Sequence, residues 1–380
     1  MTTVYLFVIF IQMTIDSSKP YNKLPLLPAT IDLKDQEILL ATIEASDGIA
    51  RLNTMLKMSD HTVANTLDLL SPLFVPEAVS SSGVENIVTT NNQVYIAKIS
   101  EVRELKPAEK EVLNYTDALM VGISKIVKKG FLNSNDFIEL QKIIEPKNSG
   151  LRKLPGTQLK NPTTGKVYYT PPEGDPRIRD LLKNFEIYFN SEVPSFEVFS
   201  RMAILHYQFE AIHPFYDANG RTGRIIMPLY LMKHGRLSLP LLFISSYILD
   251  HRDEYYKKIR GVTYDKKWKD WIIYIINATT KQAYYTCEIL EKIHKTMDAL
   301  RVKLKNELPG IYSAELVDFL FSNAYFTRKM LEEHLRTSYV TTRKYLEELE
   351  RKEIIVKRKQ TGANRYLYVT PEYLNILQKA

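Results

Sequence analysis

The sequence predicts a mainly α-helical protein that carries one small β-hairpin and ends in a separate C-terminal unit. Apolar residues recur at helical spacing over most of the chain, beginning near Asp35. One stretch breaks this pattern, because residues 157–160 and 166–170 read as two strands joined by a turn. The composition changes again at Pro309-Gly310, where a compact unit of about 70 residues begins, a size usual for a small domain.

The helices are expected in succession behind a proline-rich arm at residues 19–32. Asn133 is a candidate helix cap, and Pro176 opens a further helix. The run from Val198 to Ile212 holds little charge, so its helix is expected inside the core. The apolar spacing predicts helices at 35–45, 48–58, 60–72, 106–127, 137–143, 176–190, 195–212, 225–232 and 268–303.

The composition limits the class of protein. The chain has 380 residues, 45% hydrophobic and 25% charged, which is typical of a soluble globular protein with two or three domains. Cys287 is the single cysteine, which excludes a disulfide framework and a zinc site built from several cysteines. One cysteine suits a reducing cytoplasm, where the protein is expected. A net charge of +7 and a pI near 9.0 favour an anionic partner, such as a nucleotide or a nucleic acid.

The first residues form an apolar run from Val4 to Ile11 that is too short to cross a bilayer. They carry neither the basic start nor the small-residue cleavage site of a signal peptide. Met13 begins a polar stretch, so we interpret residues 1–12 as an upstream extension, with translation starting at Met13. No membrane partner is expected.

The chemistry concentrates in twelve residues, His213-Pro-Phe-Tyr-Asp-Ala-Asn-Gly-Arg-Thr-Gly-Arg224, and an apolar run follows at once. This order predicts a polar loop that enters a buried helix, whose N-terminus presents unpaired N–H groups and a partial positive charge. Gly220 and Gly223 let the backbone approach a ligand, while Arg221 and Arg224 share a helical face and can bind phosphate oxygens. The pattern predicts a polyphosphate cradle with His213 at its mouth. His213 taken alone would favour a structural interpretation, in which a basic loop caps a core helix and a backbone carbonyl accepts from the histidine, but the full set of residues favours the cradle.

The twelve residues resemble the signature of the Fic family, His-Pro-Phe-x-Asp/Glu-Gly-Asn-Gly/Lys-Arg-x-x-Arg. Almost every fixed position matches. The departure is Ala218, where the family usually has glycine, so the local backbone and anion contacts can differ there. The resemblance covers nearly the whole chain after Met13. It implies a helical Fic core that transfers AMP from ATP to a hydroxyl of a target protein, a reaction known as AMPylation.

The resemblance also implies roles within the motif. His213 would be the general base for the attacking hydroxyl, which an unperturbed pKa of about 6.5 suits. Asp217 would hold Mg²⁺ together with phosphate oxygens. Asn219 and the backbone N–H groups after it would meet the α- and β-phosphates, Arg221 would stabilise charge on the β-phosphate, and Arg224 would hold the γ-phosphate. The implied nucleotide-binding set is Ala218, Asn219, Gly220, Arg221, Thr222, Gly223 and Arg224.

An upstream segment, residues 80–87, fits a second pattern of the same family. Taken by itself, it is a polar turn before a helix. Beside the Fic motif, Ser81, Glu85 and Asn86 match the inhibitory element Ser/Thr-x-x-x-Glu-Gly/Asn. A carboxylate that reaches Arg224 would occupy the arginine that should hold the γ-phosphate, so the resemblance implies autoinhibition by Glu85.

Three further features flank the motif. The resemblance implies that the hairpin is a flap that pairs edge to edge with the target segment, and the alternative is a surface hairpin without a role. Residues 246–248 with Tyr255 and Tyr256 would line the nucleoside side, although paired tyrosines are more often packing residues. His206 is interpreted as structural, because it stands seven residues before His213, which is not the i, i+4 spacing of a helical zinc pair.

The C-terminal unit is expected to hold three helices and a hairpin, an order that resembles a winged helix. The helices are expected at 314–321, 327–334 and 338–352, and the strands at 354–359 and 365–369. Basic residues crowd the third helix, namely Arg343, Lys344, Arg351 and Lys352, so DNA is a candidate partner. A docking module is the alternative, with a homodimer or another protein as the partner.

We divide the chain into the extension at 1–12, an arm and helical region with the inhibitory motif at 13–105, the Fic core at 106–304 and the winged helix at 305–380. Three other functions stay open. The same site could remove AMP or transfer another phosphate-containing group, and the chain could be a DNA-binding regulator. A metal hydrolase would use His213 and Asp217, but no second histidine has a suitable spacing.

Overall fold

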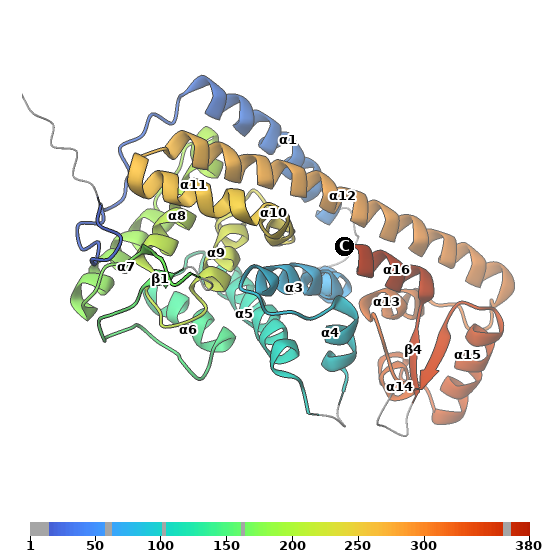
Figure 1. The fold of residues 1–380 in the computed structure, drawn as a ribbon. Helices are drawn as coiled ribbons and strands as arrows, with labels where there is room; N and C mark the ends of the chain where they lie inside the picture. Colours follow the sequence, from blue (N-terminus) through green and yellow to red (C-terminus); the bar gives the residue numbers. More distant parts are fainter. Residues whose placement is uncertain (1–14, 58–62, 101–103, 161–163, 360–365) are drawn as a thin grey trace, which may run out of the picture.

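The computed structural model describes residues 15–57, 63–100, 104–160, 164–359 and 366–380. Within these ranges the protein is built from α-helices and two small antiparallel hairpins, which confirms the mainly α-helical prediction (Figure 1). The interpretation of the first twelve residues as an extension concerns a part of the chain outside the described residues. None of the described helices is both long and apolar enough to cross a membrane.

Helix α1 (Gln36–Lys57) lies along the long helix α12 (Trp268–Glu307) at one side of the molecule (Figure 1). The prediction of two short helices here, the second at 48–58, is wrong, because one helix continues through Gly48. A Cβ atom at Gly48 would come within 3.3 Å of Ala283 of α12. The glycine therefore permits close packing of the two helices and does not end the first. With 40 residues, α12 is longer than predicted.

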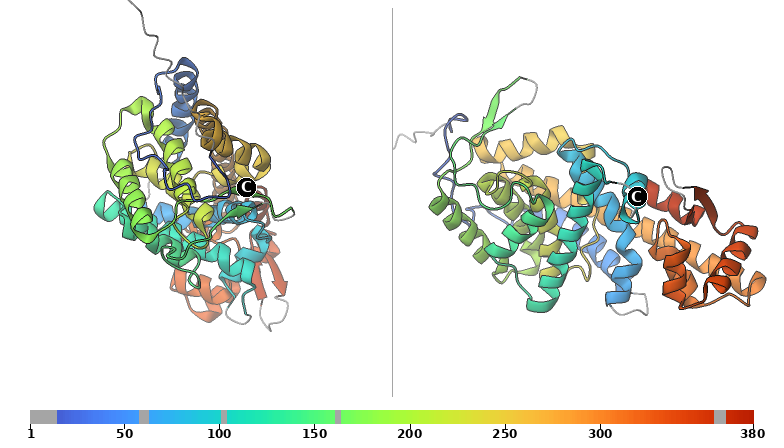
Figure 2. Two further views of the ribbon diagram at one scale, coloured as in Figure 1. Left: turned by 60° about the vertical axis from the view of Figure 1, so that its left-hand side comes forward. Right: turned by 90° about the horizontal axis from the view of Figure 1, so that it is seen from below.

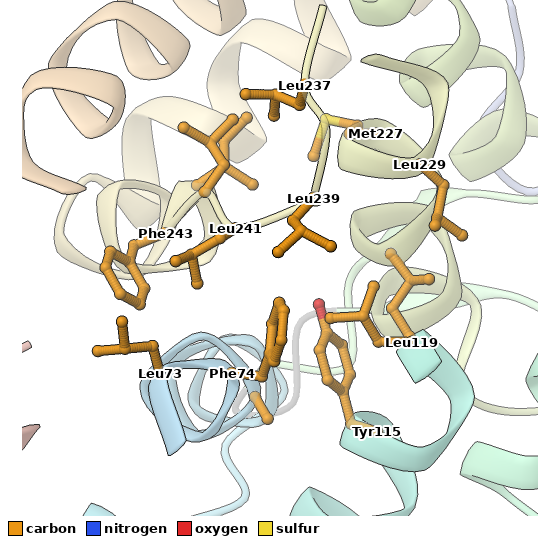
Figure 3. Close-up of a cluster of buried hydrophobic side chains, with 14 of the residues drawn as sticks. Leu73, Phe74, Tyr115, Leu119, Met227, Leu229, Leu237, Leu239, Leu241 and Phe243 are labelled. Atoms are coloured by element: carbon orange, nitrogen blue, oxygen red, sulfur yellow. The ribbon is translucent and has the colours of Figure 1, made fainter. Parts of the chain in front are cut away.

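The core packs around helices α8 (Val198–Ile212) and α9 (Asn219–Lys233), whose side chains are nearly all buried. Helix α5 (Pro107–Lys129) lies so close to α9 that a Cβ atom at Gly122 would come within 2.4 Å of Leu229. The apolar cluster beside this contact includes Leu73, Phe74, Tyr115, Leu119, Met227, Leu229, Leu237, Leu239, Leu241 and Phe243 (Figure 3). The second half of the predicted phosphate motif therefore starts a helix that is packed firmly in the core.

Shorter helices complete the body, and Asn133 caps one of them, α6, through its side chain as predicted. The apolar spacing does not predict α4, which begins with a capping box formed by Thr90 and Gln93. Short 3-10 turns precede α3 and α8, at Ser71–Leu73 and Ser195–Glu197. The shorter helices are α2 (Val63–Leu70), α3 (Phe74–Val84), α4 (Asn91–Lys98), α6 (Ser134–Ile144), α7 (Asp175–Asn190), α10 (Ile244–Asp250) and α11 (Arg252–Asp265).

The central hairpin pairs β1 (Leu159–Lys160) with β2 (Val167–Tyr169) in antiparallel fashion, as predicted. The N-terminal arm runs beside it, since the N–H of Tyr21 donates to the carbonyl oxygen of Thr170 at 3.0 Å. The segment before the hairpin forms an isolated antiparallel bridge with the loop between α8 and α9, at residues 151 and 215. The hairpin is thus joined at its base to the loop that holds His213.

The C-terminal unit follows the predicted order of three helices and a hairpin, and its name as a winged helix stays a prediction. Its elements are α13 (Ala314–Ser322), α14 (Arg328–Leu335), α15 (Tyr339–Arg351), β3 (Val356–Lys359), β4 (Tyr366–Val369) and α16 (Pro371–Lys379). Helix α16 is an addition that the apolar spacing does not predict. The predicted loop at 360–364 lies outside the described residues.

This C-terminal unit forms one end of the molecule and packs against α2, α4 and α12 (Figure 2). The hydroxyl of Tyr325 donates to Oδ1 of Asn92 at 2.6 Å, and Nδ2 of Asn91 donates to the carbonyl oxygen of Leu377 at 3.3 Å. Both asparagines belong to the first turn of α4. The unit is therefore anchored on the short helix that follows the predicted inhibitory segment.

Candidate active site at the start of helix α9

The loop between α8 and α9 brings the predicted base and cradle together. His213 ends α8 and Ala218 begins α9, and both have left-handed backbone conformations, with φ of 48° and 65°. Glycine adopts this conformation without steric cost, which explains why the Fic signature has glycine where Ala218 stands. The side chain of Asn219 accepts from the N–H of Phe215 and donates to its carbonyl oxygen, both at 2.9 Å. That side chain therefore shapes the loop, and its contact with phosphates stays a prediction.

Arg152 is a site residue that the sequence analysis missed. Its side chain is only 1% exposed, and it donates through Nε to the carbonyl oxygen of His213 at 2.6 Å and through Nη2 to that of Ile212 at 3.1 Å. Nη2 also donates to the carbonyl oxygen of Pro172, after the hairpin. One buried guanidinium thus ties the hairpin to the end of α8. The sequence around a single arginine in a loop does not show whether its side chain is buried or solvated.

Gln141, another missed residue, supports the loop from α6. Its Nε2 donates to the carbonyl oxygens of Asp217 at 3.2 Å and Asn148 at 3.1 Å, and its Oε1 accepts from the N–H of Gly150 at 2.9 Å. The side chain is fully buried. Through these three hydrogen bonds, Gln141 joins the loop at residues 148–150 to the loop between α8 and α9.

The surroundings of His213 favour its neutral form. Burial and the nearby Arg152 guanidinium lower the pKa of His213 to about 4, against the opposing effects of Glu85 and Asp217. The imidazole is therefore neutral near pH 7 and can accept a proton. A neutral histidine at the mouth of the cradle is the protonation state that a general base requires.

Glu85, just past the end of α3, contacts Arg224 as the resemblance implies. Its Oε1 lies 2.7 Å from Nη2 of Arg224, while Ser81 accepts from the same guanidinium through Oγ and its carbonyl oxygen, each at 2.9 Å. Burial alone would raise the pKa of Glu85, but Arg224 outweighs that effect, and the pKa lies below its usual value. A Cβ atom at Gly220 would lie 2.2 Å from Oε1 of Glu85. The carboxylate therefore rests against the first turn of α9, where an anion is favoured.

The turn after Glu85 is held by α11. Asn86 has a left-handed φ of 64°, and its Oδ1 accepts from Nη1 of Arg252 at 2.7 Å. The guanidinium of Arg252 also lies 5.7 Å from the ring centre of Tyr256. All three residues of the predicted inhibitory element, the serine, the glutamate and the asparagine, are thus engaged by arginines of the core.

The predicted tyrosine pair and His206 lie near one another, and Tyr255 and His206 are buried. Tyr255 is buried, and its hydroxyl lies 2.9 Å from Nε2 of His206, whose ring stacks on Trp271. Burial lowers the pKa of His206 to about 3, so it is a neutral core residue. This environment agrees with the structural interpretation of His206.

Arg221 is buried beside two carboxylates at the edge of the site. Its Nη1 lies 2.6 Å from Oε2 of Glu111 of α5, and its Nη2 lies 3.2 Å from Oδ1 of Asp217. The hydroxyl of Thr222, also buried, donates to the carbonyl oxygen of Ala218 at 2.7 Å, so it stabilises the helix start. Arg221 therefore approaches the cradle with its charge already partly balanced by Glu111, a partner that the sequence analysis missed.

A further carboxylate, Glu210 of α8, lies under the cradle. A Cβ atom at Gly223 would come within 2.8 Å of its Oε1. Burial raises the pKa of Glu210 to about 7, although Arg224 opposes this. The carboxyl of Glu210 therefore holds its proton to a higher pH than an exposed glutamate does, and Gly223 leaves the space for it.

The residues present fit a magnesium ion that arrives with phosphates. The side chain of Asp217 is 52% exposed and stands beside the cradle, and Mg²⁺ in such sites takes one or two carboxylates plus substrate oxygens. Among the described residues, no group of three or more His, Cys, Asp or Glu side chains could hold a metal ion by itself. The exposed carboxylate of Asp217 is thus one protein ligand that a metal–nucleotide complex could use.

Comparison with known proteins agrees with this geometry. The Fic/DOC family model matches residues 131–231, which contain the whole loop and the start of α9, and the model of the Fic/DOC N-terminal region matches 39–124. The chain belongs to the Fic/DOC family. The C-terminal domain model of SoFic-like protein adenylyltransferases matches residues 296–373 of this Fic protein. The recognition made from the motif is therefore confirmed.

Curated relatives of this Fic protein carry the name protein adenylyltransferase Fic. The one from Aedes aegypti is 32% identical over 136 residues, which are 35% of this chain and 26% of that protein. The one from Culex quinquefasciatus is 28% identical over 190 residues, which are 48% of this chain and 36% of that protein. The chain thus spans about a third or less of the length of these two relatives.

Solved structures support the Fic fold. A crystal structure of a Fic family protein from Desulfovibrio desulfuricans superposes with a TM-score of 0.56 at 17% identity, covering 90% of this chain and 97% of that one. A Fic domain containing signaling protein from Bacteroides thetaiotaomicron has a TM-score of 0.51 at 15% identity, covering 64% of this chain and 96% of that one. The first of these likenesses extends over most of the chain.

Proposed function

We propose that this Fic protein transfers AMP from ATP to the hydroxyl of a Tyr, Thr or Ser side chain in a target protein. The observation that carries the proposal is the loop–helix unit, in which the loop of His213 leads directly into the helix start that holds Arg221 and Arg224. A base, a helix N-terminus and two arginines in one turn suit attack on a polyphosphate. The two mosquito relatives that carry the name protein adenylyltransferase support the same reaction.

In the proposed reaction, neutral His213 takes the proton of the target hydroxyl as its oxygen attacks the α-phosphate. The bond from the α-phosphorus to the bridging oxygen breaks, and pyrophosphate leaves. Asp217 would hold Mg²⁺, which neutralises phosphate charge when bound. Arg152 keeps the carbonyl side of the His213 loop in position, and backbone N–H groups of α9 together with Arg224 bind the phosphates.

We also propose that Glu85 inhibits the enzyme. The carboxylate lies on Arg224 and against Gly220, which is the place that the γ-phosphate needs. A phosphate and a carboxylate cannot occupy that position together, since both carry negative charge. Glu85 must therefore move before ATP can bind productively.

The test is a labelling experiment with ATP that carries the radiolabel at its α-phosphate, in the presence of Mg²⁺. We expect label on protein with Glu85→Gly, much less with wild type, and none with His213→Ala in the Glu85→Gly background, although that double variant should still bind ATP. Loss of label with ATP binding intact assigns the base. Equal labelling by wild type and Glu85→Gly would contradict the inhibitory role of Glu85.

A second reaction at the same site is favoured by one observation. The carboxylate of Glu85 lies 2.7 Å from Nη2 of Arg224 and against the first turn of α9, the helix that begins at the loop of His213. In AMP removal, a carboxylate in this position could orient a water molecule toward the α-phosphate. The assay is release of AMP from a pre-modified protein, with Glu85→Gly expected to be inactive if removal is the natural reaction. A γ-labelled nucleotide in the same assay detects transfer of another phosphate-containing group.

Further assignments complete the proposal. On the basis of the single cysteine we place the protein in the cytoplasm, and we keep the division into 13–105, 106–304 and 305–380. The boundary at 304 falls in the last turn of α12. ATP and a hydroxyl-bearing target protein are the proposed partners. The further candidate partners are a second copy of the chain, in a homodimer, and DNA at the winged helix. The function as a DNA-binding regulator would depend on the DNA contact.

A further inference from the structure

A second cleft lies away from the His213 site, between α4 and the C-terminal unit. Its volume is about 810 Å³, within the range of ligand pockets, and such pockets are common between domains. Tyr95 and Lys98 of α4 line one side, and α14, one face of α15 and strands β3 and β4 line the other. It shares no lining residue with the site around His213.

Cations dominate the charge of this cleft. Its lining contains Lys98, Arg328, Lys329, Arg343 and Lys357 against three glutamates. Arg343 pairs with Glu347 at 2.8 Å, and Lys329 lies 3.7 Å from Glu333. Arg328 pairs with Glu332, and the carboxylates of Asp68 and Asp117 act on Lys98 from beyond ion-pair distance. Among the described residues, Lys357 has no carboxylate within ion-pair distance. The cleft therefore offers Lys357, and in part Lys98, to an anionic ligand.

Two exposed tyrosines line the cleft, each beside a cation. Tyr339 is 53% exposed, and the guanidinium of Arg328 lies 4.2 Å from its ring centre. Tyr366 is 49% exposed, and Nζ of Lys357 lies 4.2 Å from its ring centre. Exposed rings on which bases can stack, placed next to cations that can meet phosphates, are what single-stranded nucleic acid uses on proteins.

We propose that this cleft binds nucleotide units, either as free nucleotides or within a single-stranded nucleic acid, with bases on Tyr339 and Tyr366 and phosphates at Lys98 and Lys357. The proposal is independent of AMP transfer and goes beyond it. Double-stranded DNA fits less well. The face of α15 that carries Tyr339 and Arg343 looks across the cleft toward α4, whereas a duplex needs an open helix face for a major groove about 12 Å wide.

The test measures fluorescence anisotropy of the full chain with a labelled oligothymidylate of about eight nucleotides, at low salt. We expect Tyr366→Ala to weaken binding roughly tenfold, because one base–aromatic stack is lost. Lys357→Glu should weaken it at least as much. Lys344→Glu is the matched control, since it makes the same charge change at an exposed residue of α15 that does not line the cleft.

Competition separates the two sources of the ligand. Displacement of the strand by AMP assigns free nucleotides as ligands, and resistance to AMP assigns the single strand. Four results would overturn the proposal. The first two are equal losses for Lys344→Glu and Lys357→Glu, and tighter binding of the duplex of the same length. The other two are displacement by an acidic peptide as readily as by unlabelled strand, and absence of binding to either nucleic acid at low salt. Thermal unfolding of each variant checks that the exposed substitutions leave the fold intact.

Discussion

At the scale of single residues, the site depends on side chains that hold backbone in place. Arg152 donates to carbonyl oxygens at the end of α8 and after the hairpin, and Asn219 bonds to both backbone groups of Phe215. These contacts fix the loop without touching the proposed substrate. The residues that would meet ATP, by contrast, already have protein partners, because Glu85 and Ser81 occupy Arg224.

The first prediction concerns the charge of Arg152 and the base. Arg152→Met in the Glu85→Gly background should lower the rate by roughly a hundredfold, because the loop loses its support. Removing the guanidinium should also raise the pKa of His213 toward its ordinary value, so the rate begins to fall at a higher pH on the acidic side than in Glu85→Gly alone. The pH–rate profile measures this shift.

Arg152→Lys is the control, since it keeps the positive charge but cannot donate to several carbonyl oxygens at once. We expect a similar loss of rate with the acidic limb of the profile nearly unmoved. If the lysine and methionine variants had the same acidic limb, Arg152 would not act on His213 through its charge.

The second prediction uses Gly220. Gly220→Ala would bring a Cβ atom within 2.2 Å of Oε1 of Glu85, so it should lower the melting temperature of the wild type. In the Glu85→Gly background that contact is absent, so the same substitution should lower the melting temperature less. A double-mutant cycle by thermal unfolding should give a coupling energy of about 0.5–3 kcal/mol. Additive effects would mean that the carboxylate does not rest on the first turn of α9.

At the scale of elements, close helix packing positions the phosphate motif. Helix α9 begins at the loop of His213, runs through the core and approaches α5 at Gly122. A Cβ atom at this position would force the buried side chain of Leu229 to shift. The position of the N-terminus of α9, and with it the cradle, therefore depends on a glycine outside the motif.

The third prediction follows from this packing. Gly122→Ala should destabilise the protein by about 1–3 kcal/mol, because its Cβ atom would come within 2.4 Å of Leu229. Gly261→Ala in α11 is the control, since its Cβ atom would meet only ordinary contacts at 3.6 Å or more. The free energy of unfolding of the control should rise by up to about 1 kcal/mol, because alanine has a higher helix propensity than glycine. Chemical denaturation measures the unfolding free energy of both variants. A Gly122→Ala variant as stable as the wild type would contradict the close approach of α5 and α9.

At the scale of the whole molecule, buried ionisable groups make stability depend on pH. Burial raises the pKa of Glu77 in α3 to about 8, although hydrogen bonds from Ser245 oppose this. Burial lowers the pKa values of His206 and His213. The histidines therefore reduce stability as the pH falls below their unfolded pKa of about 6.5, and Glu77 reduces it as the pH rises.

The fourth prediction isolates Glu77. Between its unfolded pKa of about 4.5 and its folded pKa of about 8, the native state keeps a proton that the unfolded chain has released. Stability conferred by this proton is present at the acidic end of that window and is lost toward the basic end. Glu77→Gln, which has no proton to lose, should show a smaller fall in unfolding free energy between about pH 5 and about pH 8. Parallel pH dependences would contradict the raised pKa of Glu77.

The sequence by itself determined the helical class, the central hairpin, the order of the C-terminal elements and the composition of the phosphate motif. These depend on neighbours in the chain, whose periodicity and spacing are visible in the sequence. The tertiary structure alone decided that α1 continues through Gly48, that Arg152 holds the loop of His213, and that Glu85 rests on Gly220. These features are contacts between residues far apart in the chain. Whether a glycine ends a helix or permits close packing, and whether an arginine is solvated or buried, depends on which elements fold against it.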